Sequence, residues 1–219
     1  MTFYLDNKIL LSYTVTCQEM ISKETFRNLI PGEKSLMTDK IHNLVNIALM
    51  AAIICVLSPW SIPIGPVPIT LGLAAVLLAV YLLGTLKGTA ATCIYLLIGL
   101  VGLPVFSGFT GGASKLAGPT GGYLIGYIPM ALFAGFFIHR FYKNVILQYL
   151  GMALSLAVLY IFGTAWLCLS ASMTVSAACA VAVWPFIPFD LIKLAVVIAL
   201  GRVLRSQLVK ADLLKAAAA

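Results

Sequence analysis

The chain has 219 residues, of which 62% are hydrophobic and only 10% are charged, and its formal net charge is +7. Soluble domains carry about 25% charged residues, so this composition excludes an ordinary soluble domain and indicates an integral membrane protein. The positive charges lie at the ends of apolar runs, where topology signals and anionic lipid contacts place them. The basic balance therefore does not require nucleic acid as a partner.

Residues 1–36 differ from the rest of the chain, because they mix polar, charged and aromatic residues without a sustained apolar run. They lack the apolar core and small-residue cleavage site of a signal peptide. We expect them to form a polar leader or tail, with Met37 as a possible natural start of translation. The membrane domain is then predicted to cover 37–210, followed by a short C-terminal tail at 211–219.

Apolar runs predict about six membrane-spanning helices, since one span needs about 20 residues. The predicted spans are 41–58, 69–84, 88–103, 121–138, 145–169 and 186–204. The stretch 172–184 is small and apolar but too short to span alone. It is interpreted as a re-entrant segment or as an extension packed on the bundle.

Loop charges orient the predicted bundle. Lys40, Lys87, Arg140 and Lys143 fall on one side, and only Lys115 falls on the other. The cations after the last span lie on the first side as well, namely Arg202, Arg205, Lys210 and Lys215. The positive-inside rule then places both termini in the cytoplasm. Together with the six apolar runs, this predicts an all-α six-transmembrane-helix bundle with both termini cytoplasmic, and we expect it in the cell (inner) membrane.

One acidic residue lies within the apolar part of the chain. Asp190 is the only acid between Ile41 and Ala211, and Lys193 follows it by one helical turn, so both side chains share a helix face. Charges at membrane depth are costly and mark a functional site by default. A structural ion pair joining helices is the alternative. As a binding site, the pair suits a ligand with an N–H donor end and a carboxylate end.

The loop 104–120 is rich in glycine and lies on the same predicted side of the membrane as Asp190. Glycine permits close backbone approach to a ligand, so the loop is either a lid over the site or a plain connector. It lacks the GxxxxGK[ST] pattern of a phosphate-binding loop.

Two further patterns concern packing. Ala48 and Ala52 form a small-xxx-small pair that lets another helix approach closely, either within the bundle or from a partner. The five cysteines are scattered without a CxxC pair, so they are interpreted as small buried apolar residues, with no metal site expected.

Four motifs occur in a characteristic order: Val67–Thr70 (VPIT), Gly99–Phe106 (GLVGLPVF), Gly118–Leu124 (GPTGGYL) and Pro185–Lys193 (PFIPFDLIK). Over about residues 41–205 the chain resembles the BioY family, the biotin-binding S components of energy-coupling factor (ECF) transporters. Residues 1–36 lie outside the resemblance.

The resemblance implies a six-helix membrane bundle that binds biotin near the outer surface. It implies that Asp190 serves the ureido end of biotin and that Lys193 contributes to holding the carboxylate. Tyr123 and Thr120 are further candidates, and the segment 59–68 and the loop 104–120 would help to cover the site. Ser107 stands where some relatives carry a polar amide, so serine or backbone would replace that hydrogen bond.

The resemblance also implies partners. Ala48 and Ala52 match the surface on which S components dock to the transmembrane coupling subunit, and two cytoplasmic ATPases complete the transporter. In the implied mechanism the bundle binds biotin outside and topples within the membrane to release it inside. Membrane lipid and biotin are thus the expected small-molecule partners, with no cofactor.

Two other functions remain open from the sequence. One is a solitary biotin carrier that needs no ATPase. The other is an intramembrane enzyme that uses Asp190 as acid or base, which would require a second titratable group at the same depth. His42 and His139 both fall at the opposite, cytoplasmic ends of their predicted spans, so no catalytic residue is predicted.

Overall fold

The computed structural model describes residues 31–63 and 67–210, with side chains from Lys40 onward. The chain divides into two compact units, Met1–Leu44 and Val45–Ala219. Helix α2 (Pro31–Leu57) passes from the first unit into the second. In the first unit the description is limited to the first half of this helix. The fold and the site described below belong to the second unit.

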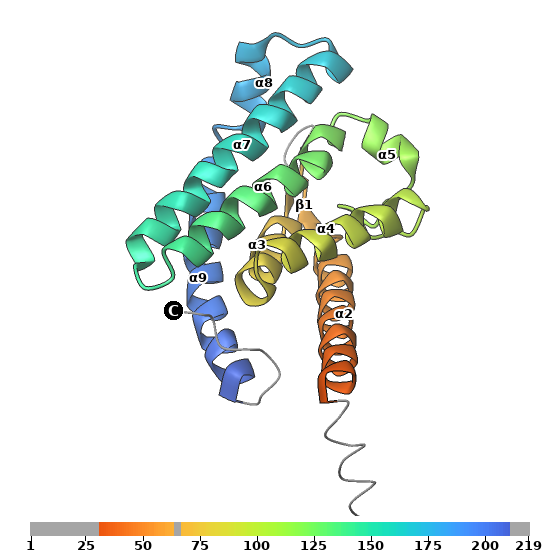
Figure 1. Cartoon of the computed structure of the whole chain (residues 1–219). Coiled ribbons are helices and arrows are strands. Elements are labelled where there is room, and N and C mark those ends of the chain that lie inside the picture. Colours follow the sequence, from red (N-terminus) through yellow and green to blue (C-terminus); the bar gives the residue numbers. More distant parts are fainter. Residues whose placement is uncertain (1–30, 64–66, 211–219) are drawn as a thin grey trace, which may run out of the picture. The chain divides into compact units, whose positions relative to one another are not determined.

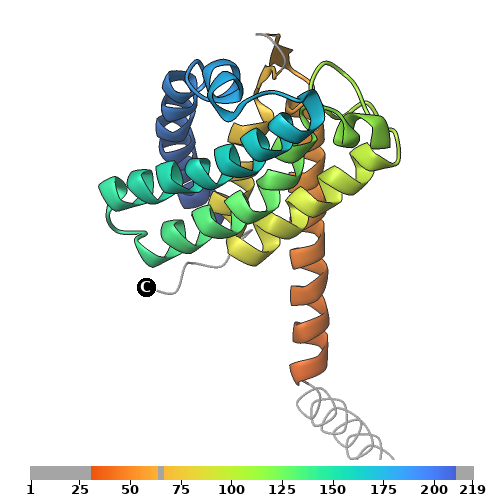
Figure 2. The same ribbon diagram turned by 90° about the horizontal axis from the view of Figure 1, so that it is seen from above.

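The second unit is built from helices (Figure 1). After α2 they are α3 (Gly72–Leu83), α4 (Thr85–Leu100), α5 (Ala113–Ala117), α6 (Gly121–Arg140), α7 (Val145–Ala171), α8 (Val175–Ala182) and α9 (Ile187–Lys210). Helices α4, α6 and α7 run side by side, as Figures 1 and 2 both show. Helix α3 packs against α4, α6 and α9, and α9 also contacts α7.

Several of these helices are suited to a membrane. In the described part of the chain, three helices are long and apolar enough to cross it: the Lys40–Leu57 part of α2, α6 and α7. A fourth span results if α8 and α9, which meet at a 49° bend, count as one. Helices α3 and α4 are apolar but have only 12 and 16 residues. These lengths and compositions support a multi-pass membrane protein. Each of the six predicted spans overlaps one helix, in the predicted order.

The ends of the helices were predicted less accurately than their order along the chain. The first two residues of the second predicted span form strand β2 (Ile69–Thr70), which pairs antiparallel with β1 (Ser61–Ile62). The expectation of helix from residue 69 is therefore wrong, and α3 begins at Gly72. The β-branched Ile69 and Thr70 suit a strand, and both pair with residues of β1.

Close contact between α6 and α7 depends on glycines. A Cβ added at Gly122 of α6 would clash with the Trp166 side chain and would lie 2.8 Å from the Phe162 carbonyl oxygen of α7. A Cβ at Gly163 of α7 would clash with the ring of Tyr123. The absence of side chains at these positions lets the two helix backbones approach each other.

The stretch 172–184, for which the sequence left two interpretations open, forms a separate short helix. Ser172, in the left-handed conformation, ends α7, and Thr174 caps α8 by accepting a hydrogen bond from Ala177 N. Helix α8 packs on α7 with Ala178 and Ala182 buried. Pro188 lies in the first turn of α9, where its missing N–H leaves no intrahelical hydrogen bond unmade. The chain thus turns between α8 and α9 just before Asp190.

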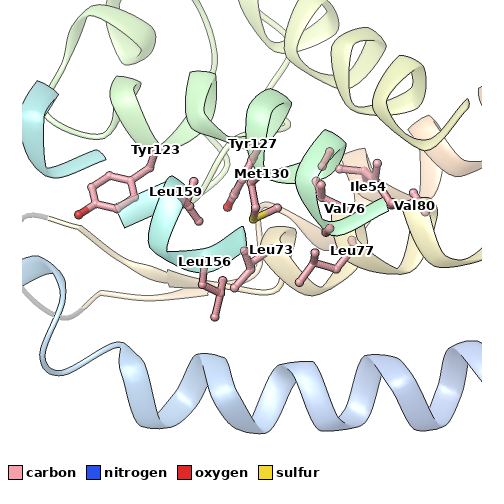
Figure 3. Close-up of a cluster of buried hydrophobic side chains, with 14 of the residues drawn as sticks. Ile54, Leu73, Val76, Leu77, Val80, Tyr123, Tyr127, Met130, Leu156 and Leu159 are labelled. Carbon is pink, nitrogen blue, oxygen red and sulfur yellow. The ribbon is translucent and has the colours of Figure 1, made fainter. Parts of the chain in front are cut away.

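The core lies between α3, α6, α7 and the second half of α2. Figure 3 shows Leu73, Tyr127, Met130 and Leu159 among the side chains that gather there.

The four cysteines that the structure describes are free, as expected, but they are half-buried rather than buried. Cys17 lies outside the described residues.

Candidate functional site

One pocket opens beside this core. Chain segments that are distant in sequence line it: Ser58 after α2, Thr70 of β2, Leu73 of α3, Tyr127 of α6, Tyr160 of α7 and Asp190 of α9. Space not filled by protein atoms amounts to about 570 Å³, including the open mouth. Because this figure includes open solvent at the mouth, the enclosed part of the pocket is smaller.

The charged residues of this pocket form a compact cluster. Lys193 Nζ donates to Asp190 Oδ1 at 3.0 Å, as the one-turn spacing predicts. The Tyr160 hydroxyl donates to the other oxygen, Asp190 Oδ2, at 2.7 Å. The Asp190 side chain is 6% exposed and that of Lys193 is 14% exposed. Asp190 lies in the first turn of α9, where the helix dipole favours a negative charge.

Burial makes this ion pair an expensive feature. Removing two charges from water costs several kcal/mol per ion, and a buried pair is often no more stable than apolar residues of the same volume. The interpretation as a mere structural link between helices is also weakened, because both residues lie on α9. The pair instead places one carboxylate and one ammonium on the wall of a pocket.

The rest of the pocket combines hydroxyl groups with apolar walls. Thr70 Oγ1 and the Tyr127 hydroxyl lie 3.5 Å apart, and the buried Ser58 Oγ lies 2.6 Å from the Tyr95 hydroxyl. Apolar surface comes from Val67, Ile69, Leu73, Leu124, Leu159 and Phe186. Such a lining suits a ligand with an apolar body and a few polar groups at its ends.

All five binding residues predicted from the sequence line this one pocket: Ser107, Thr120, Tyr123, Asp190 and Lys193. The two segments expected to cover the site both contribute, through Val67 and Pro68 and through Ser107 and Thr120. Tyr123 contributes its ring, because its hydroxyl donates to the Ala182 carbonyl oxygen at 3.1 Å. The predicted docking residues Ala48 and Ala52 are not part of the pocket and are exposed on α2.

Sequence reasoning missed Tyr160, Tyr127, Ser58 and Thr70. Tyr160 is a hydroxyl-bearing residue inside the apolar run of α7, which is a usable signal. Nothing in the sequence, however, shows which face of α7 meets α9. The tyrosine could therefore not be assigned to Asp190 before the packing was known.

Comparison with known proteins agrees with the motifs. The sequence model described as "BioY family" matches residues 30–210, so it begins within the segment that we expected to lie outside the family. A "Biotin transporter BioY" of Thermotoga maritima is 40% identical over 71% of this chain and 91% of the relative. The "Biotin transporter BioY2" of Lactococcus lactis subsp. cremoris is 36% identical over 76% of this chain and 91% of the relative.

A solved structure is similar as well. It is the 2.1 Å crystal structure of the S-component for biotin from an ECF-type ABC transporter. The two folds superpose with a TM-score of 0.72 at 31% sequence identity, over 77% of this chain and 93% of the other. With a family model covering most of its length and relatives of this similarity, the chain belongs to the BioY family.

Proposed function

We propose that this protein is the substrate-binding membrane subunit for biotin uptake, with the pocket around Asp190 as the biotin site. The observation that carries the proposal is the ion pair between the buried Asp190 and the partly buried Lys193 on the wall of a largely apolar pocket in a BioY chain. The relatives named above are biotin transporters and not enzymes. Biotin is then the transported ligand, and no cofactor is required.

The pair provides complementary groups for both ends of biotin. The Asp190 carboxylate keeps lone pairs beyond those used by Tyr160 and Lys193, so it can accept from the ureido N–H groups. The more exposed Lys193 ammonium pairs with the valerate carboxylate. Ser107, Thr120 and the Tyr123 ring complete the contacts, and the apolar walls cover the ring system and the chain.

Removing either charge should weaken binding strongly, because the variant loses a charged group that we propose to contact biotin. We expect Asp190→Asn and Lys193→Ala to lower biotin affinity by roughly 30-fold or more, equivalent to about 2–5 kcal/mol. Titration calorimetry on the purified protein measures this, with gel filtration as the check of folding. Parent-like affinity in both variants would show that the site lies elsewhere.

The assignment of each end can be tested with biotin methyl ester, which lacks the carboxylate charge. If Lys193 holds the carboxylate, Lys193→Ala weakens biotin strongly but the ester hardly at all. Asp190→Asn weakens both ligands by a similar factor. The reverse pattern would exchange the two roles. This comparison of variants and ligands isolates each pairwise interaction, as a double-mutant cycle does.

We also propose the topology that follows from the loop charges: six spans, with both termini in the cytoplasm of the inner membrane. An alkaline phosphatase fusion after Lys115 should be active, because this residue lies in the proposed outer loop. A fusion after Lys143 should be inactive, since alkaline phosphatase folds only outside the cytoplasm. Activity at both positions, or only after Lys143, would contradict the arrangement.

For transport we propose assembly with a transmembrane coupling subunit and two ATPases, since the chain itself carries no recognisable phosphate-binding loop. Ala48 and Ala52 are exposed on α2 rather than used in the packing of this bundle. An exposed small-residue pair suits close approach of a partner helix. A solitary carrier is the competing arrangement, and biotin uptake in cells without the coupling subunit distinguishes the two.

A further inference from the structure

Two arginines converge on Tyr81 at the basic end of α9. Arg205 Nη1 donates to the Tyr81 carbonyl oxygen at 3.1 Å, and its guanidinium lies 5.0 Å from the centre of the Tyr142 ring. Arg202, one turn earlier, lies beside the Tyr81 side chain. The close approach of α9 to the Tyr81 ring is possible because Gly201 has no Cβ. An added Cβ would lie only 2.5 Å from the ring.

This cluster has no counter-charge within the described part of the chain. Arg205 is only 7% exposed. Asp190 is the only acidic residue whose side chain the structure describes, and it is paired with Lys193. Buried charges in proteins are normally paired, because desolvation is costly. The Tyr81 carbonyl accepts one hydrogen bond from Arg205 and the Tyr142 ring faces its guanidinium, but neither neutralises the positive charge.

An apolar groove leads away from Arg202 between α7 and α9. Ile146 and Leu150 form its wall on α7, and Ala195 and Ala199 line it on α9. The two alanines are exposed and one turn apart, so the helix surface is hollow between them. Tyr149 presents its ring to the groove, because its hydroxyl donates to the Leu191 carbonyl oxygen at 3.1 Å. Arg202 is the only charged residue that lines the groove.

We propose that this groove binds an anionic phospholipid. An acyl chain lies along Ala195 and Ala199, and the phosphate pairs with Arg202. A lipid has an apolar chain and a charged headgroup, and it therefore matches an apolar groove with a single cation at one end. Basic pockets between membrane helices bind anionic headgroups in the same way, and a guanidinium pairs with phosphate through two parallel hydrogen bonds. The phosphate would also supply the negative charge that the Arg202–Arg205 cluster lacks.

The headgroup is tested on the full-length protein in neutral detergent, by native mass spectrometry with phosphatidylglycerol and phosphatidylcholine of identical chains. The parent should retain phosphatidylglycerol about tenfold better, and Arg202→Gln should abolish that preference. Arg140→Gln is the matched control, because Arg140 is exposed and does not line the groove. It should change the preference by less than roughly threefold.

The acyl-chain part is tested by filling the groove. Ala199→Leu should lower retention of both lipids, whereas Ala171→Leu, at the exposed end of α7, should not. Three outcomes overturn the proposal. The parent retains the two lipids equally, Arg140→Gln and Arg202→Gln have equal effects, or Ala199→Leu has no effect. A fourth is an Arg202 effect that is seen only with the coupling subunit present, which would assign the arginine to a protein partner. If Arg202→Gln aggregates, the parent's headgroup preference and Ala199→Leu decide.

Discussion

Asp190 is held by two donors before any ligand arrives. Tyr160 occupies one oxygen and Lys193 the other, so the carboxylate is fixed in one orientation on the pocket wall. A pre-positioned acceptor loses little freedom when a ligand binds, and this favours affinity. The aspartate and the lysine could be identified from the sequence, because Asp190 is the only acid in the apolar part of the chain and Lys193 follows it by one helical turn. The third member of the cluster depends on the register between α7 and α9, which no local pattern encodes.

Tyr160→Phe should therefore weaken biotin binding about tenfold, because it removes a hydrogen bond to a charged group and leaves the ring in place. Tyr149→Phe is the matched control. Tyr149 also lies on α7 and donates to a residue of α9, the Leu191 carbonyl, but it does not line the pocket around Asp190. Equilibrium binding of radiolabelled biotin measures both variants. Equal losses would mean that Tyr160 acts only by joining the helices.

At the level of elements, glycines on α6 and α7 decide how closely the pocket walls approach. Gly122 and Gly126 lie one turn apart on α6, both facing α7. At Gly122 an added Cβ meets the backbone carbonyl of Phe162 and the Cβ of Trp166, which cannot move away easily. At Gly126 the nearest atom is a terminal methyl of Leu159 at 3.0 Å, which can rotate.

Gly122→Ala should accordingly destabilise the protein by about 1–3 kcal/mol, the usual cost of overpacking. Gly126→Ala should cost clearly less, although it adds the same methyl group to the same helix. Thermal unfolding of both variants in detergent measures the difference. A smaller loss for Gly122→Ala than for Gly126→Ala would contradict the close contact between α6 and α7.

Apolar runs predicted the order of the helices well, because burial and membrane contact both require continuous hydrophobicity. They predicted helix ends less well. The start of α3 depends on the pairing of Ser61 with Thr70 and of Ile62 with Ile69, contacts between segments on either side of a proline-rich loop. The break between α3 and α4 falls at Gly84, whose φ of +94° only glycine adopts readily. Both features arise from local backbone geometry that hydropathy does not report.

For the whole molecule, the docking role that we propose for the exposed pair Ala48 and Ala52 predicts that binding and transport can be separated. We expect Ala48→Leu with Ala52→Leu to leave biotin affinity unchanged and to reduce both co-purification of the coupling subunit and biotin uptake, at least about fivefold. Bulky side chains would prevent the close approach that small residues permit. Ala171→Leu, at an exposed position on α7, is the control and should affect neither. Parent-like uptake in the α2 variant would favour a solitary carrier.

If the bundle reorients in the membrane, as the family resemblance implies, the ion pair in the pocket has an electrical consequence. Lys193 and Asp190 cancel, so the empty site is neutral, whereas the site loaded with biotin carboxylate carries one negative charge. Moving that charge inward against an inside-negative potential costs about 2.3 kcal/mol per 100 mV. Without other energy, a carrier would leave biotin about 50-fold less concentrated inside than outside at that voltage. The neutral empty bundle returns without this penalty, so voltage opposes only the loaded step.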